Sequence, residues 1–145
     1  MKKLIFILIF FVGFFAPTHS NQNVEEIIKG RKAMFSENYQ NAKKISILLK
    51  SKRIEEAKPI MEKISTNYKK LLNYFPENTK EGFNTEALPS IWENKDEFNA
   101  LMRKASDDMM KLAKTVDTVE DFRKIQKELM WNNCSSCHNR FRAPH

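Results

Sequence analysis

The only two cysteines of the 145-residue chain, Cys134 and Cys137, stand three residues apart and are followed directly by His138. This Cys-x-x-Cys-His spacing is the attachment signature of a c-type haem. On a helix, residues three apart project from the same side, so both thiols can add to the two vinyl groups on one edge of a porphyrin. His138 is then placed to offer an imidazole nitrogen to the iron. The motif predicts one haem c, attached through Cys134 and Cys137 and ligated axially by His138.

Other uses of the cysteine pair fit the sequence less well. A thioredoxin-like dithiol lies at the start of a helix that follows a strand, whereas this pair ends a helical segment. A zinc site has four protein ligands, and only His138 and His145 accompany the two cysteines. A lone disulfide, or two thiols without a function, is the remaining alternative.

The elements that must position this motif are helices. From Asn23 onward, apolar residues recur at spacings of three and four, the period of an amphipathic helix. Four such stretches cover about 24–50, 53–74, 94–116 and 118 to the C-terminus, with a long polar connection from Phe75 to Pro89. Asn23 and Asn94 each have a glutamate three residues later, which is the spacing of a capping box. Only three glycines and five prolines argue against a many-stranded fold. We therefore predict an all-α, antiparallel four-helix bundle with haem attached near its C-terminus.

The N-terminal segment predicts export. Two lysines precede an apolar run from Leu4 to Ala16, and small or polar residues follow up to Ser20. This pattern is typical of a signal peptide, and the run is too short to favour a membrane-spanning helix. We predict a signal peptide at residues 1–20, a single domain at residues 21–145 and a periplasmic location, with an uncleaved anchor as the alternative.

Charge gives no sign of a nucleic-acid partner. Cleavage would remove two lysines and no acids, so 25 − 2 lysines and arginines against 18 acids leave a net charge of +5 instead of +7. The positive residues are scattered among glutamates and aspartates and form no basic block. We therefore predict no nucleic-acid binding and, after cleavage, no membrane attachment.

The chain resembles the class II c-type cytochromes of the cytochrome c′ group over essentially all of residues 21–145. The strongest part runs from Cys134 to Arg142, which is similar to that family's attachment site followed by an aromatic residue and an arginine one turn past the histidine. Weaker matches are Arg31, Phe75-Pro76 and Ile91-Trp92. The resemblance implies a four-helix bundle around the haem and a position for Arg142 near the proximal face.

The residue on the far side of the iron decides between two functions. By the resemblance, it lies one turn after Arg31, at Phe35, next to Met34. A Met34 sulfur would complete a six-coordinate centre suited to electron transfer, whereas Phe35 would leave an open site for nitric oxide or carbon monoxide. Relative to Arg31, Met34 lies about −60° and Phe35 about +40° around a helix axis, so both can face the haem. Our first hypothesis is a mono-haem electron carrier, and the alternative is a gas-binding haem protein.

Arg31 stands in an otherwise apolar stripe. If buried, it needs an acceptor such as a haem propionate or a helix-end carbonyl. The alternative is a side chain that reaches solvent at the edge of the bundle.

Positive residues flank the attachment motif with only Glu128 opposing them. They are Arg123, Lys124, Lys127, Arg140 and Arg142. They could steer an acidic redox partner to the haem edge, or only offset the haem propionates. The resemblance also leaves room for a homodimer. No paired carboxylates, and no nucleophile with a base, indicate an enzyme.

Overall fold

The computed structural model describes residues 19–144 of the chain. The predicted signal peptide therefore lies almost entirely outside the described residues. Within this range the secondary structure is helical, apart from one isolated antiparallel bridge between Ala87 and Arg142.

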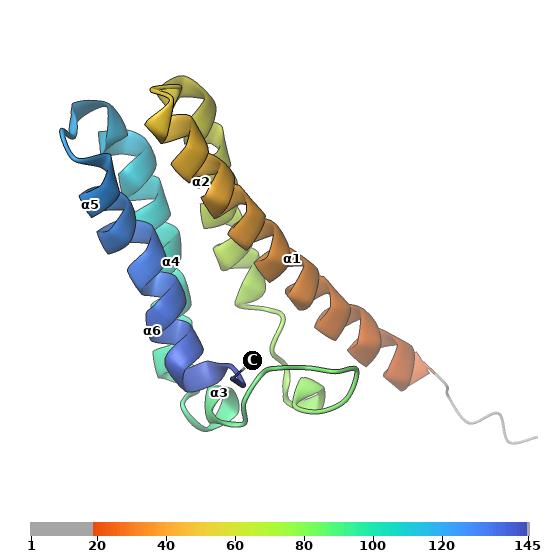
Figure 1. Ribbon diagram of the computed structural model, residues 1–145. Coiled ribbons are helices and arrows are strands. Elements are labelled where there is room, and N and C mark those ends of the chain that lie inside the picture. Colours follow the sequence, from red (N-terminus) through yellow and green to blue (C-terminus); the bar gives the residue numbers. More distant parts are fainter. Residues whose placement is uncertain (1–18, 145) are drawn as a thin grey trace, which may run out of the picture.

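Four long helical segments run in alternating directions and form a bundle (Figure 1). The first three are α1 (His19–Lys50), α2 (Ile54–Leu71) and α4 (Lys95–Thr115), and the fourth is a continuous helix made of α5 (Phe122–Gln126), the π-helical turn η3 (Lys127–Trp131) and α6 (Asn132–Phe141). Short elements occupy the connections: η1 (Glu77–Thr79), α3 (Ser90–Glu93) and η2 (Val116–Thr118). The predicted antiparallel four-helix bundle is confirmed.

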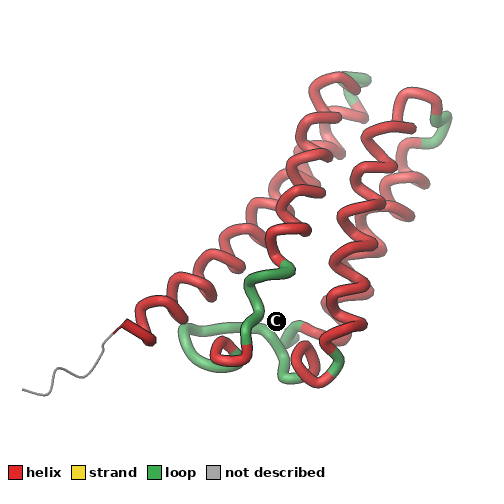
Figure 2. The backbone as a smooth tube through the Cα atoms, turned by 180° about the vertical axis from the view of Figure 1, so that it is seen from behind, coloured by secondary structure: helices red, strands yellow, loops and turns green. Residues whose placement is uncertain are grey.

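The two ends of the bundle differ. The short turns, between α1 and α2 and between α4 and α5, lie together at one end (Figure 1). The long connection from α2 to α4 crosses the other end, where the C-terminal tail also lies (Figure 2). Toward that end, the pair α1–α2 diverges from the pair formed by α4 and the last helix. The attachment motif is on α6, in the diverging part.

Local signals explain the helix ends only in part. Asp121 caps α5, because its carboxylate accepts from the backbone N–H groups of Arg123 and Lys124 at 2.9 and 3.0 Å. Asn94 precedes α4, but its side chain donates to the Ser90 carbonyl and caps nothing. The predicted start at Asn23 is wrong, because α1 already begins at His19 and runs through that position.

The hydrophobic core consists of two clusters. One lies toward the end with the short turns and is mainly aliphatic, with Leu49, Met61 and Leu112 at its centre. The other lies toward the long connection and is largely aromatic: Leu71, Phe75, Ile91, Trp92, Phe98, Met102 and Phe141. Residues of both clusters line a large cavity, which therefore lies where the core is divided.

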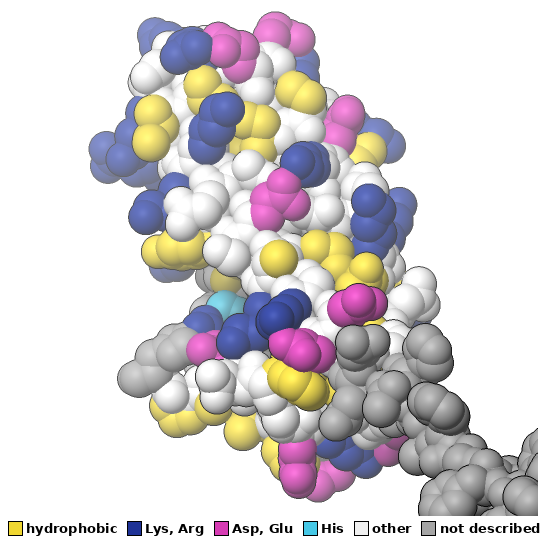
Figure 3. Space-filling model, turned by 90° about the vertical axis from the view of Figure 1, so that its right-hand side faces the viewer, with side chains coloured by type: hydrophobic (Ala, Val, Ile, Leu, Met, Phe, Trp, Pro, Cys, Tyr) yellow, Lys and Arg dark blue, Asp and Glu magenta, His cyan; other side chains and the backbone are white. Residues whose placement is uncertain are grey.

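On the face shown in Figure 3, lysines and arginines alternate with aspartates and glutamates, which matches the scattered charge of the sequence. Among residues 19–144, none of the helices combines the length and the apolar character that crossing a membrane requires.

Candidate cofactor site

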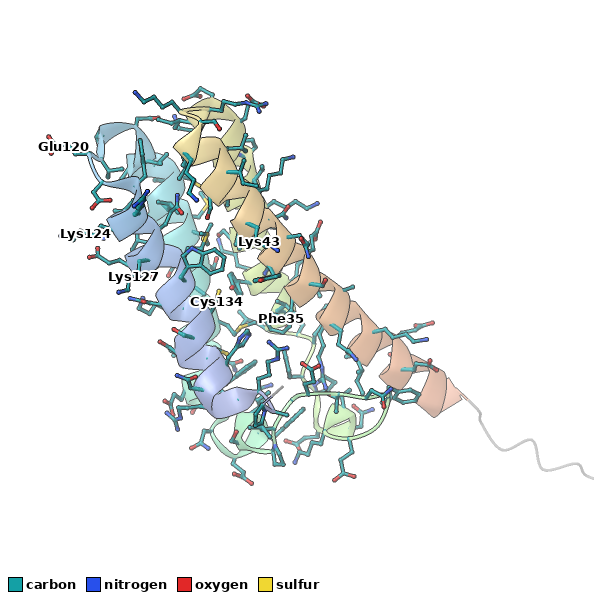
Figure 4. The ribbon with its side chains drawn as sticks, viewed as in Figure 1. Phe35, Lys43, Glu120, Lys124, Lys127 and Cys134 are labelled. Carbon is teal, nitrogen blue, oxygen red and sulfur yellow. The ribbon has the colours of Figure 1, made fainter. Side chains whose placement is uncertain are left out.

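The cavity, of about 790 Å³, opens between α1 and α6. Ligand pockets in proteins have about 300–1,000 Å³, so this volume suits a large organic cofactor. All four helical segments and the long connection contribute to its lining. Phe35 from α1 and Cys134 from α6 face it from its two sides (Figure 4).

Both cysteines of the motif line this cavity as free, half-buried thiols. Burial raises the pKa of Cys137 to about 11 and also raises the pKa of Cys134. The hydroxyl of Tyr68, on α2, hydrogen-bonds to Cys134, and burial raises the pKa of that hydroxyl too. The two thiols are therefore neutral, close to each other along one helix and directed at the same apolar space, which suits covalent attachment of a planar group.

His138 lines the same cavity and is otherwise exposed. Its backbone carbonyl accepts the N–H of Arg142, which closes α6. The π-helical turn η3 ends immediately before α6. Such turns occur often at functional sites, and the extra residue rotates the following part of the helix by about 100° around the axis. The turn therefore helps to set which face of α6 carries the motif into the cavity.

The two candidates for the distal position are separated by the fold. Phe35 lines the cavity, whereas Met34 is not among the lining residues and packs at the edge of the aromatic cluster. The Phe35 ring meets Phe75 edge-on at 6.4 Å between centroids. Phe75 in turn packs against Phe98 at 4.7 Å, and Phe98 against Phe141 at 5.4 Å. This end of the cavity is thus walled by rigid aromatic side chains.

Arg31 is buried, with 2% of its surface exposed, and binds the chain itself. Its terminal nitrogens donate to the Tyr74 carbonyl, the Thr79 hydroxyl and carbonyl, and the Thr85 hydroxyl, at 2.6 to 3.2 Å. The guanidinium also lies 4.6 Å from the centroid of the Phe75 ring, a cation–π contact. Burial lowers the pKa of Arg31 to about 10. Arg31 is therefore an anchor of the long connection at the cavity, and a side chain reaching solvent at the bundle edge is excluded.

Arg142 also lines the cavity and closes it near the C-terminus. Its Nε donates to Glu86 Oε2 at 2.8 Å. Beside this ion pair, the N–H of Ala143 donates to the Glu86 carbonyl and the N–H of Leu88 to the Phe141 carbonyl. The end of α6 is thereby fastened to the same connection that Arg31 anchors from α1.

Most lining residues of the cavity were not candidates from the sequence, and some of them have polar side chains that contact another helix. Tyr68 and Asn38 stand at helical spacing within the apolar stripes of α2 and α1, and both line the cavity. A polar side chain within an apolar stripe was the only sign of either residue in the sequence. Tyr68 hydrogen-bonds to Cys134 and Asn38 to Asn67, and each of these partners lies on another helix, so the sequence alone could not reveal the contacts.

The competing uses of the cysteines find no support among residues 19–144. There, His, Cys, Asp and Glu side chains form no group of three or more that could hold a metal ion, as a zinc site would require. The two thiols are free and form no disulfide. A largely apolar cavity with two thiols and a histidine on one helix fits a haem attached by thioether bonds.

Comparison with known proteins decides the family. The family model "Cytochrome C'" matches residues 26–142. The chain belongs to the cytochrome c′ family. Cytochrome c′ of Rhodopseudomonas palustris is 31% identical over 123 residues, which cover 81% of this chain and 82% of that protein. The predicted family and the haem c cofactor are confirmed.

Solved cytochromes c′ share the fold of this chain. A structure of the Rhodopseudomonas palustris protein superposes with a TM-score of 0.71 at 30% identity, covering 82% of this chain and 97% of that one. Cytochrome c prime from Shewanella frigidimarina gives a TM-score of 0.71 at 22% identity, covering 83% and 97%. The cytochrome c′ domain therefore spans the whole four-helix bundle.

Proposed function

We propose that the protein binds nitric oxide or carbon monoxide at an open distal site on its haem. Bound haem c supplies an iron that changes oxidation state and that takes up a diatomic gas when one axial position is free. Cys134 and Cys137 would hold the haem covalently, and His138 would ligate its iron. The support for these roles is that all three residues line one cavity from one helix.

One observation carries the preference for gas binding over ligation by methionine. Phe35, and not Met34, lines the cavity on the wall opposite α6. A phenyl ring has no lone pair to give to iron, and the ring is held in place by its contact with Phe75. A largely apolar cavity favours small neutral gases over charged ligands, because an anion would lose its hydration there.

The spectrum of the purified, reduced holoprotein tests this proposal. We expect a high-spin spectrum that shifts when carbon monoxide is added, and that stays unchanged in Met34→Ala. Phe35→Ala should alter the rate of gas binding while the haem remains attached. A low-spin spectrum that Met34→Ala converts to high spin would refute the open site and establish Met34 as a ligand.

Electron transfer is the second candidate, and the positive side chains beside the Cys-x-x-Cys-His motif favour it, because they could draw an acidic redox partner toward the haem edge. Of the five positive side chains near the motif, Arg140 pairs with Glu97 and Arg142 with Glu86. Lys124 and Lys127 point outward from the last helix, with Glu120 close to the start of α5 (Figure 4). If an acidic redox partner uses this surface, its rate of electron exchange should fall steeply with salt and fall further in Lys124→Gln/Lys127→Gln.

We also propose that the protein is exported to the periplasm and cleaved after Ser20. Cleavage there would remove His19 and Ser20 from the start of α1 and leave the cavity residues in place. The mass of the holoprotein from a periplasmic extract tests this directly. A chain that begins at Asn21 and carries one haem is expected, and a full-length chain in the membrane fraction would contradict it.

A further inference from the structure

Asn133 stands directly before the attachment motif, and each polar atom of its side chain is hydrogen-bonded. Its Nδ2 donates to Asp108 Oδ2 at 2.9 Å and to the Leu129 carbonyl at 3.0 Å. Its Oδ1 accepts from Lys104 Nζ at 3.2 Å. An asparagine amide has two hydrogens to donate, and both are used here. The side chain is therefore held in one orientation, although the residue is only half-buried.

Asp108 links this amide to α4, which packs against both η3 and α6 (Figure 1). The Asp108 side chain is 16% exposed, and its Oδ2 accepts from Asn133 and also pairs with the exposed Lys104. A carboxylate with little access to water forms stronger hydrogen bonds than one on the open surface. The contact between Asp108 and Asn133 is therefore a firm tie between α4 and the last helix.

The tie lies at the junction between the π-helical turn η3 and α6. Leu129 lies within η3, and Asn133 is the second residue of α6. Across the turn, the N–H of Asn132 donates to the Lys127 carbonyl, five residues back instead of four. The Asn133 side chain thus joins the turn, the start of α6 and α4 at one point. A rotation of α6 about its axis would carry Asn133 away from Asp108 and break their hydrogen bond.

The rotation of α6 sets the direction of the attachment motif. Cys134, Cys137 and His138 follow Asn133 within about one and a half helical turns, and all four residues line the cavity. Because these side chains belong to one helix, a turn of α6 at Asn133 would move them together relative to the other cavity walls. Holding Asn133 against α4 therefore keeps the motif directed at the cavity.

We propose that Asp108 and Asn133 are positioning residues for the haem, because they fix the rotation of α6 and thereby the direction in which the attachment motif meets it. Asp108 does not line the cavity and acts through Asn133. Hydrogen bonds beyond the immediate ligands hold those ligands in one orientation and tune the metal. This role rests on the proposed attachment and ligation through Cys134, Cys137 and His138.

Circular dichroism of the holoprotein in the Soret band tests this role, because its sign and amplitude depend on how the haem is oriented among the surrounding side chains. Asp108→Leu should change this spectrum, whereas Asp108→Asn keeps an oxygen that accepts from Asn133 and should preserve it. Glu97→Gln is the matched control. Glu97 also joins α4 to α6, through Arg140, but both side chains are exposed and Arg140 lies beyond the motif. That variant should give the wild-type spectrum.

A second variant keeps the test decisive if Asp108→Leu does not fold, which far-ultraviolet circular dichroism shows. Asn133→Ala removes the amide but leaves the ion pair of Asp108 with Lys104, and it should change the Soret spectrum as Asp108→Leu does. If a folded Asp108→Leu or Asn133→Ala gave the wild-type spectrum, or Asp108→Asn changed it as much as Asp108→Leu, the positioning role would be overturned. Wild type that binds no carbon monoxide would refute the open distal site, while the comparison among these variants would still decide the role of Asp108.

Discussion

Replacing Arg31 by methionine should destabilise the protein far more than the loss of one ordinary hydrogen bond. The guanidinium links α1 to three residues of the long connection, and all of its acceptors are carbonyl or hydroxyl oxygens. Methionine keeps an apolar stem of similar length, so Arg31→Met removes the hydrogen bonds with little change in packing. The connection, which forms one end of the cavity, then loses its attachment to α1.

The magnitude follows from two opposing effects. A hydrogen bond from a charged donor contributes about 1.5 kcal/mol at the lower end of the usual range, so four contribute about 6 kcal/mol. Burial lowers the pKa of Arg31 from 12.5 to about 10. At about 1.4 kcal/mol per pKa unit, burying the charge costs about 3 kcal/mol. We therefore expect Arg31→Met to lower the free energy of unfolding by about 3 kcal/mol.

Urea unfolding of the holoprotein at pH 7, followed by far-ultraviolet circular dichroism, measures this change. Lys32→Met is the matched control, because Lys32 Nζ also donates to the connection, to the Asn84 carbonyl at 2.9 Å, but from an exposed position. That variant should lose about 0.5 kcal/mol or less. If Arg31→Met lost no more than Lys32→Met, the assignment of Arg31 as the anchor of the connection would be refuted.

Three further changes test the packing, the capping and the charge network. Leu112→Ala empties a fully buried site and should cost about 3 kcal/mol or more in urea unfolding, whereas Ile47→Ala, at a side chain that is 64% exposed, should cost about 0.5 kcal/mol or less. Asp121→Ala removes two hydrogen bonds to the start of α5 and should cost about 1 kcal/mol, while Asn94→Ala should cost clearly less; equal losses would contradict the capping role of Asp121. Glu37→Gln should lower stability at pH 7 but lose its effect in acid. The pKa of Glu37 is lower in the folded state than its usual 4.5, so its contribution is present above pH 4.5 and disappears as the pH falls through the folded-state pKa; a difference from wild type that does not shrink as the pH is lowered below 4.5 would argue against the ion pair of Glu37 with Lys63.

Sequence patterns were most informative where a local arrangement determines the outcome. The helical period alone places Leu112 and Met109 on the buried face of α4. Patterns failed where the deciding partner is remote. Asn94 has the spacing of a capping box, but its side chain donates to the Ser90 carbonyl instead. The π-helical turn before α6 was not predicted, because the spacing of the apolar residues does not reveal it.

At the cofactor site, too, features set by local spacing were predictable and features set by remote contacts were not. The family and the haem c cofactor follow from the Cys-x-x-Cys-His motif and the helical pattern, because attachment chemistry depends on residues that are neighbours on one helix. The distal residue does not follow, since Met34 and Phe35 differ by one helical step and both were compatible with facing a haem. Only the tertiary structure shows that Phe35 lines the cavity and that Met34 does not.

The amino-acid sequence by itself predicted the four helices and singled out the Cys-x-x-Cys-His motif, because each depends on spacing within a single helix. The tertiary structure alone decided what surrounds them. The partners of Arg31 lie 43 to 54 residues further along the chain, and Asn38 meets Asn67 across 29 residues. Contacts at such separations are set by how the helices pack against one another, and no local pattern encodes that packing.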